Sequence, residues 1–190
     1  MFTSPSSRPL RTALMALLVV IAVVGAACSG SDASSDGLPD LEDVPGAEAG
    51  SGGGDTAPDF TVMTLDSAGF TLSEHLADDG RPVFLNMWAS WCPPCRAEMP
   101  DIDSASASHE GVKFIGVAAN DDPVEATEFA TSIDIGYTIG FDEHGTVARA
   151  YEVVGLPASY IISSDGIILE RIFGSVTEAE IDEILNRWFS

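Results

Sequence analysis

Two cysteines, Cys92 and Cys95, are separated by two prolines and follow an apolar run at 83–88. A cysteine pair with this spacing can close into a disulfide, and it can also supply two ligands to a metal site. Prolines suit the first turn of a helix, because their backbone angle is already helical and a first-turn N–H has no partner within the helix. The pattern therefore predicts a strand over 83–88 and a helix that starts at the cysteines.

A thiol at the start of a helix is expected to have a lowered pKa. Free backbone N–H groups and the helix dipole favour the thiolate, so Cys92 should be the thiol that attacks other disulfides. Cys95 lies one turn further along and is expected to be more buried, which suits the thiol that closes the pair. Pro93 and Pro94 remove two donors. The near donor that remains is the N–H of Cys95, so the lowering of the Cys92 pKa should be moderate.

Other uses of the cysteine pair fit the sequence less well. A zinc site needs four ligands, and the three histidines, His75, His109 and His144, are scattered far from the pair. A copper chaperone of the Sco type would show a wider cysteine spacing and a placed histidine. A peroxidase of the peroxiredoxin type usually has Thr or Ser where Ala89 stands. The flanking tryptophans and the helix start disfavour a purely structural disulfide, although the spacing alone leaves it open.

Composition limits the remaining classes of protein. The chain has 190 residues, eight Lys plus Arg against thirty Asp plus Glu, a formal net charge of −22 and three cysteines. Binding of phosphate depends on Lys and Arg, so a nucleic-acid partner is not expected. With 45% hydrophobic residues the chain can build a real core, unlike a disulfide-stapled mini-protein. Exchange between sulfurs carries two electrons directly, so neither a metal nor an organic cofactor is expected.

The N-terminal segment has the features of an export signal. A short positive stretch precedes an uncharged run over 13–27, which ends in small residues at Cys28. This pattern resembles a bacterial lipobox, which implies that 1–27 is a lipoprotein signal peptide and that Cys28 is lipidated. Ordinary signal cleavage is one alternative. A permanent transmembrane helix is another, although the run is short for the hydrocarbon core of a bilayer.

Two further segments follow the signal. Residues 28–56 are rich in Ser, Gly and acidic residues and have few large apolar ones, which predicts a disordered tether. Residues 57–190 have regular apolar periodicity and should form one domain. The expected location is the extracytoplasmic face of the cytoplasmic membrane, where the lipid would anchor the domain.

Short apolar runs separated by turn residues fill this domain. They predict strands at 60–65, 83–88, 112–119, 137–141, 158–162 and 167–173. They predict helices at 72–77, 93–109, 123–132, 146–151 and 177–188. The alternation indicates parallel strands with helical crossovers on both faces of a sheet. A turn at Asp165 and Gly166 predicts an antiparallel hairpin at the end, so the central sheet should be mixed.

The chain resembles the thioredoxin fold and, more narrowly, the TlpA/ResA-like (CcmG/DsbE-like) thiol-disulfide oxidoreductases that are anchored to membranes. The resemblance rests on the segment WASWCPPC at 88–95, followed by Glu98 and Pro100, on APDF at 57–60 and on GLPAS at 155–159. It covers roughly 57–189. It implies an α/β thioredoxin-like fold with a central mixed sheet flanked by helices, an N-terminal β extension and a central insertion over 121–137.

The resemblance also implies roles for single residues. The proline matching Pro157 is cis in the family and faces the cysteines, where the backbone of Leu156 can meet an extended peptide. Glu98 would tune the thiols and exchange protons with them, whereas its position alone would suit a solvated helix residue. Asn86 stands where thioredoxin has a buried Asp, which leaves Glu98 as the nearby candidate base. Trp91 is expected to shield the disulfide and contact substrate.

These features predict a protein disulfide reductase. Its expected partners are disulfides of exported proteins such as apocytochrome c, a membrane thiol-transfer protein as electron donor, and the membrane itself through the lipid anchor. One alternative is an oxidase or isomerase that donates disulfides through the same residues. Another is a lipoprotein that binds peptides in a redox-dependent way without turnover.

Overall fold

The structure is a computed structural model of the chain, and it describes residues 54–190. The predicted signal peptide, Cys28 and most of the predicted tether lie outside the described residues. Within 54–190, no helix combines the length and the apolar character needed to cross a bilayer.

Strands and helices alternate along the described chain. The strands are β1 (Thr61–Thr64), β2 (Phe70–Thr71), β3 (Val83–Trp88), β4 (Lys113–Ala119), β5 (Thr138–Asp142), β6 (Ala158–Ile162) and β7 (Ile168–Phe173). The helices are α1 (Leu72–Asp78), α2 (Pro93–Ser108), α3 (Pro123–Ser132), α4 (Thr146–Ala150) and α5 (Glu178–Phe189).

All seven strands belong to one sheet with the order β2-β1-β5-β4-β3-β6-β7. Strands β3, β4 and β5 run parallel, while β6 and β7 on one side and β1 and β2 on the other pair antiparallel. The predicted mixed sheet is therefore confirmed. The N-terminal β extension consists of β1 and β2. Strand β2 was not predicted from the sequence, because two residues are too few to show an alternation.

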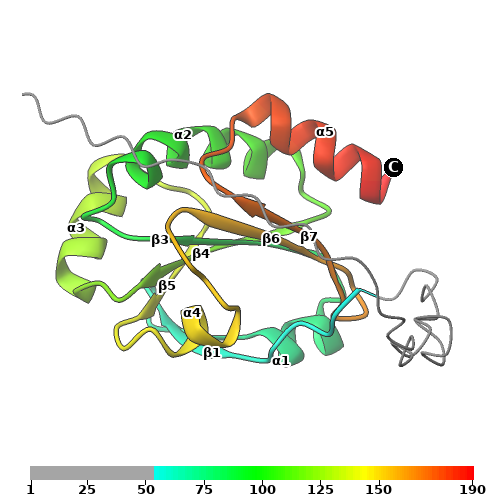
Figure 1. The fold of residues 1–190 in the computed structure, drawn as a ribbon, viewed down its shortest axis with the longest axis horizontal. Coiled ribbons are helices and arrows are strands. Elements are labelled where there is room, and N and C mark those ends of the chain that lie inside the picture. The colour runs from blue at the N-terminus through cyan, green and yellow to red at the C-terminus, as the bar shows by residue number, and fades with distance from the viewer. Residues whose placement is uncertain (1–53) are drawn as a thin grey trace, which may run out of the picture. The chain divides into compact units, whose positions relative to one another are not determined.

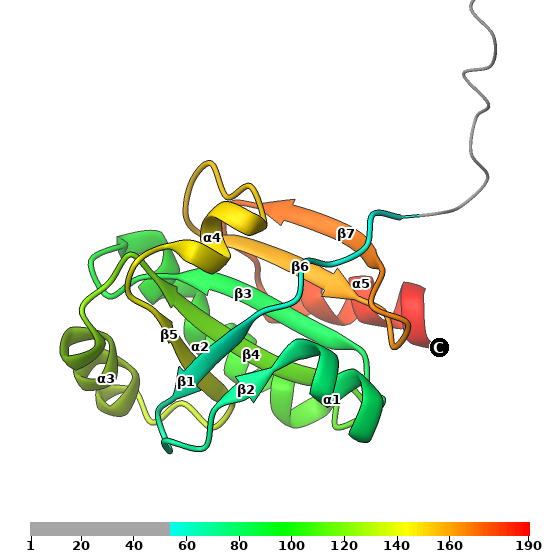
Figure 2. The same ribbon diagram turned by 90° about the horizontal axis from the view of Figure 1, so that it is seen from below.

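Helices cover both faces of the sheet. Figure 1 shows α2 and α5 above the strands and α1 and α4 below them, and Figure 2 shows α1 and α4 on the near side. Side chains from α2, α3 and α5 build one core against the sheet, and side chains from α1 and α4 belong to the other. The parallel strands are thus buried on both faces, as βαβ crossovers require.

Strand β3 carries the site at the centre of the sheet. Phe84 and Trp88 face the core under α2, while Leu85 and Met87 face the opposite core. Alternate residues of a strand point to the same face of the sheet, so the Asn86 side chain lies on the α2 side together with Phe84 and Trp88. It is fully buried. A polar side chain at that position needs hydrogen-bond partners inside the protein.

Candidate active site at the start of helix α2

Cys92 is the N-cap residue of α2 and forms a disulfide with Cys95, with 5.3 Å between their Cα atoms. The backbone N–H of Cys95 donates to Sγ of Cys92 at 3.3 Å, which confirms the expected near donor. Pro93 and Pro94 occupy the first turn, as predicted. Cys95 is completely buried and Cys92 is 4% exposed, so an incoming sulfur can approach only Cys92.

Pro157 lies beside the segment that leads to the disulfide. The Leu156–Pro157 peptide bond is cis, as the resemblance implied. Ala158, the next residue, pairs with Met87 near the end of β3, which brings the proline close to the start of α2. The carbonyl of Pro157 accepts a hydrogen bond from the N–H of Gly174 at 3.0 Å. The loop before β6 is therefore fixed to the end of β7.

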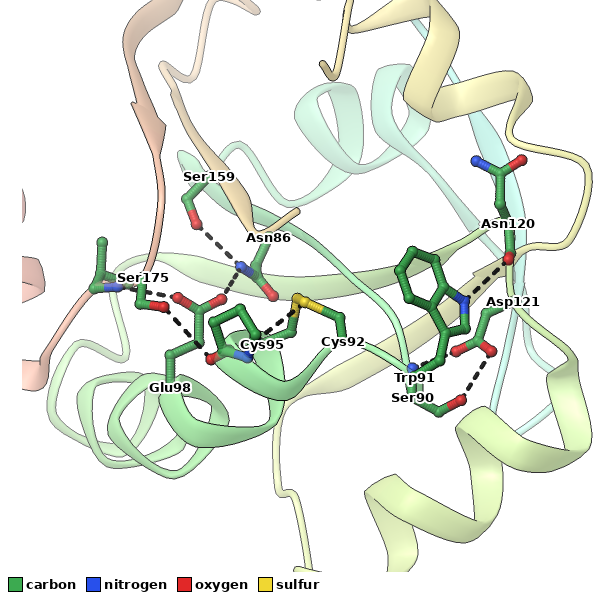
Figure 3. The surroundings of a disulfide bond; sticks show 12 residues. Asn86, Ser90, Trp91, Cys92, Cys95, Glu98, Asn120, Asp121, Ser159 and Ser175 are labelled. Carbon is green, nitrogen blue, oxygen red and sulfur yellow. Dashed lines mark hydrogen bonds between the residues drawn. A yellow bond between two sulfur atoms is a disulfide. The ribbon is translucent and has the colours of Figure 1, made fainter. Parts of the chain in front are cut away.

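Trp91 presents an apolar surface next to the disulfide. Its side chain is 59% exposed. The indole Nε1–H donates to the backbone carbonyl of Asn120 at 3.3 Å, so the ring leans over the loop between β4 and α3 (Figure 3). This position suits the predicted contact with substrate.

The same loop holds the residue before Trp91. The carboxylate of Asp121 accepts hydrogen bonds from the backbone N–H of Ser90, and from its hydroxyl at 2.8 Å. Both residues are buried. Sequence reasoning placed Asp121 only within the central insertion and gave it no role, because nothing local marks a contact between residues 31 positions apart in the chain.

Glu98 lies one turn beyond Cys95 on α2, and it is buried, with 2% of its surface exposed. Its Oε1 accepts from Nδ2 of Asn86 at 2.9 Å, and its Oε2 accepts from the backbone N–H of Val176 at 3.0 Å. Burial raises the pKa of Glu98 to about 7, although the two hydrogen bonds oppose this effect by favouring the charged form. The structure therefore does not show a solvated helix residue here.

Asn86 connects Glu98 to the neighbouring strand. Its Nδ2 also donates to Oγ of Ser159 at 3.1 Å, and Ser159 is the residue that pairs with Asn86 across β3 and β6. Figure 3 shows Asn86 between Glu98, Ser159 and the disulfide. The site thus combines the exposed Trp91 and the slightly accessible Cys92 with a buried polar network behind them. Within residues 54–190, no three His, Cys, Asp or Glu side chains are grouped to hold a metal ion.

Residues 53–171 match the AhpC/TSA family. The thiol-disulfide oxidoreductase ResA of Bacillus thuringiensis subsp. konkukian is 30% identical over 136 residues, which cover 70% of this chain and 77% of ResA. The chain belongs to the AhpC/TSA family, among its ResA-like thiol-disulfide oxidoreductases. The redox interpretation of the cysteine pair is therefore confirmed at the level of this enzyme class.

Solved structures of similar proteins agree with this assignment to the ResA-like enzymes. A Chlorobium tepidum protein described as a thiol:disulfide interchange protein DsbE is 29% identical, with a TM-score of 0.64, and covers 72% of this chain and 94% of its own. A secreted Mycobacterium tuberculosis disulfide oxidoreductase homologous to Escherichia coli DsbE is 28% identical, with a TM-score of 0.58. The match covers 67% of this chain and 92% of that protein. The thioredoxin-like α/β fold is likewise confirmed.

Proposed function

We propose that this ResA-like enzyme reduces disulfide bonds of exported proteins on the extracytoplasmic face of the cytoplasmic membrane. The observation that carries the proposal is the buried carboxyl of Glu98 behind the disulfide, whose pKa burial raises to about 7. A carboxyl with this pKa can both accept and release a proton near neutral pH, which thiol exchange requires.

The first step uses the accessible cysteine. In the reduced enzyme the Cys92 thiolate attacks one sulfur of a substrate disulfide, and the new bond forms as the substrate bond breaks. The second substrate sulfur leaves as a thiolate and takes up a proton. The position of Cys92 as N-cap of α2 favours its thiolate through the helix dipole and the N–H of Cys95.

The second step regenerates the disulfide. Cys95 transfers its proton to the Glu98 carboxylate and attacks Sγ of Cys92, and the remaining substrate sulfur leaves as a thiolate that takes up a proton. Because Cys95 is fully buried, water cannot take this proton directly. Glu98 lies one helical turn away and serves as the local proton acceptor. Glu98 then releases its own proton to solvent. Overall the substrate gains two electrons and two protons, and the enzyme is oxidised to the Cys92–Cys95 disulfide.

The substrate is expected to bind in an extended conformation over Trp91 and along the loop that contains Leu156 and Pro157. Trp91 offers an exposed apolar surface, and Leu156, in the loop before β6, is half-buried. Exported proteins such as apocytochrome c, whose haem-binding cysteines must be reduced, are the proposed substrates. A membrane thiol-transfer protein is the proposed electron donor.

The reduction potential of the cysteine pair tests the direction of the reaction. We would equilibrate the full chain in graded thiol buffers and follow the fluorescence of Trp88 and Trp91. A potential below about −220 mV supports a reductase, whereas a value near −120 mV would make the protein a disulfide donor. Repeated reduction of insulin disulfides separates a reductase or a disulfide donor from a redox-dependent binding protein, which would react only once per molecule.

The proposed anchor has its own test. A lipid on Cys28 would hold the domain at the membrane, and stable binding requires at least two acyl chains. The variant Cys28→Ala should therefore appear in the soluble fraction of cells, while the unchanged chain sediments with membranes. A Cys28→Ala protein that remains in the membrane fraction would instead favour retention of the apolar segment over 13–27 as a membrane helix.

A further inference from the structure

The carboxamide oxygen of Asn86 is a buried acceptor without a donor. It is one of three buried side-chain polar atoms in residues 54–190 that have no hydrogen-bond partner in the oxidised protein. Leaving a buried polar group unpaired is unfavourable, so such a group in a native protein calls for an explanation, and a redox role is one. Asn86 Oδ1 is the one of the three that belongs to the polar network behind the disulfide.

The orientation of the Asn86 amide is fixed by its other contacts. Both hydrogens of Nδ2 are used, one towards Oε1 of Glu98 and one towards Oγ of Ser159. Exchanging the nitrogen and the oxygen would place two acceptor oxygens against each other whenever Glu98 is ionised. The oxygen is therefore held on the side of the amide away from Glu98, and Figure 3 shows it directed towards the disulfide.

Reduction of the disulfide creates a donor on this side. Cys95 is fully buried and lies one turn before Glu98, so both side chains project from the same face of α2 towards β3. In the disulfide its sulfur carries no proton. After reduction by an external dithiol, which supplies two electrons and two protons, Cys95 carries an S–H that cannot reach water. This buried donor needs an acceptor inside the protein, and Oδ1 of Asn86 is a buried acceptor that lacks a donor.

We propose that in the reduced enzyme the Cys95 thiol donates a hydrogen bond to Oδ1 of Asn86. The Asn86 amide then links Cys95 to Glu98, because its nitrogen already donates to the carboxylate. Asn86 acts as a positioning residue that holds the resolving thiol in its protonated form next to the proton acceptor. The inference rests on the proposed role of Cys95 as the resolving thiol.

The contact should be visible in the S–H stretching band of Cys95. We would record infrared spectra of the full chain carrying Cys28→Ser and Cys92→Ser, so that Cys95 is the only thiol, and add Asn86→Ala to it. The band should move towards the frequency of a free thiol when Asn86 is replaced. Ser159→Ala is the matched control, because it removes a partner of Nδ2 and leaves Oδ1 in place, and the band should not move. An unchanged band in the Asn86→Ala protein would overturn the proposal, because the thiol would then donate elsewhere, for example to the backbone carbonyl of Trp91.

A second measurement needs no substitution at Asn86. The ¹³C chemical shift of the Asn86 carboxamide carbon should change when the disulfide of the otherwise unaltered enzyme is reduced. A resonance that stays in place on reduction would contradict the contact.

The redox equilibrium gives a third readout. Loss of the contact removes stabilisation from the dithiol state only, so Asn86→Ala should shift the equilibrium with glutathione towards the disulfide about threefold, or about 14 mV at 29.6 mV per tenfold change. A shift towards the dithiol would contradict the inference. The proposed reductase function is tested separately, by the potential and the insulin turnover of the unaltered protein.

Discussion

Oε2 of Glu98 accepts a hydrogen bond from the backbone N–H of Val176 at 3.0 Å, which connects the middle of α2 to the loop in front of α5. Val176 is buried as well. The carboxyl is therefore enclosed between two helices and the sheet, with two donors that favour its charged form. Burial outweighs these donors, which is why its pKa rises to about 7.

The raised pKa of Glu98 predicts how stability depends on pH. The folded protein keeps the proton up to about pH 7, whereas the unfolded chain releases it near the ordinary value of 4.5. The contribution of Glu98 to the free energy of unfolding of the oxidised protein should therefore be largest below pH 4.5 and fall as the pH rises to 7, by about 3 kcal/mol. Urea unfolding across this range should show the fall.

The variant Glu98→Gln should remove that part of the pH dependence. The matched control is Glu125→Gln, which alters an exposed acid on α3 and should leave the wild-type slope intact. Identical slopes for Glu98→Gln and the unaltered protein would show that the carboxyl does not titrate in this range.

Glu98 should also influence the thiols of the reduced enzyme. An ionised carboxylate one turn from Cys95 disfavours a second negative charge, so Glu98→Gln should lower the pKa of the Cys95 thiol by about one unit while the fold stays intact. Thiolate absorbance followed against pH gives the titration curve, and circular dichroism checks the fold. Titration curves that superimpose would remove Glu98 from the mechanism.

Asp121 is predicted to hold the active-site segment in place. Asp121→Ala leaves the buried N–H and hydroxyl of Ser90 without an acceptor and should cost about 1–3 kcal/mol of the free energy of unfolding. The value of kcat/KM for a disulfide substrate should also fall, because Ser90 lies two residues before Cys92. Asp121→Asn keeps one acceptor oxygen, so it should retain more of the free energy of unfolding and more of kcat/KM than Asp121→Ala.

A neighbouring residue provides the control for Asp121. Asp122 caps α3 by accepting from the N–H groups of Val124 and Glu125, and it makes no hydrogen bond to Ser90. Asp122→Ala should cost about 1 kcal/mol as a lost cap without changing kcat/KM. An equal loss of kcat/KM in both variants would indicate that the loop acts through general stability and not through Ser90.

Removal of the resolving thiol should trap substrates. In Cys95→Ser the first step still proceeds at Cys92, but the mixed disulfide cannot be released by the enzyme itself. Non-reducing electrophoresis of cell extracts should therefore show adducts of the full chain that disappear on reduction. The double variant Cys92→Ser, Cys95→Ser should form none. Adducts that persist in the double variant would assign them to Cys28.

Local features of the sequence predicted most of the secondary structure and the place of the cysteines. Strands β3 and β6 and helix α3 have the predicted bounds, and α2 starts at Pro93 as the proline pair indicated. Apolar periodicity and helix-start residues are local signals, because they depend on neighbours within a few positions. The short strand β2 carried no such signal.

The environment of the disulfide was decided by the tertiary structure. Asn86 meets Ser159 through the register of β3 with β6, Glu98 meets Val176 where α2 approaches α5, and Asp121 meets Ser90 because β4 lies next to β3. None of these pairs is close in the chain. Sheet register and helix packing set them, and with them the burial that raises the pKa of Glu98. The sequence by itself therefore determined which sulfurs react and where the helix begins, whereas only the folded chain determined which groups control their protons.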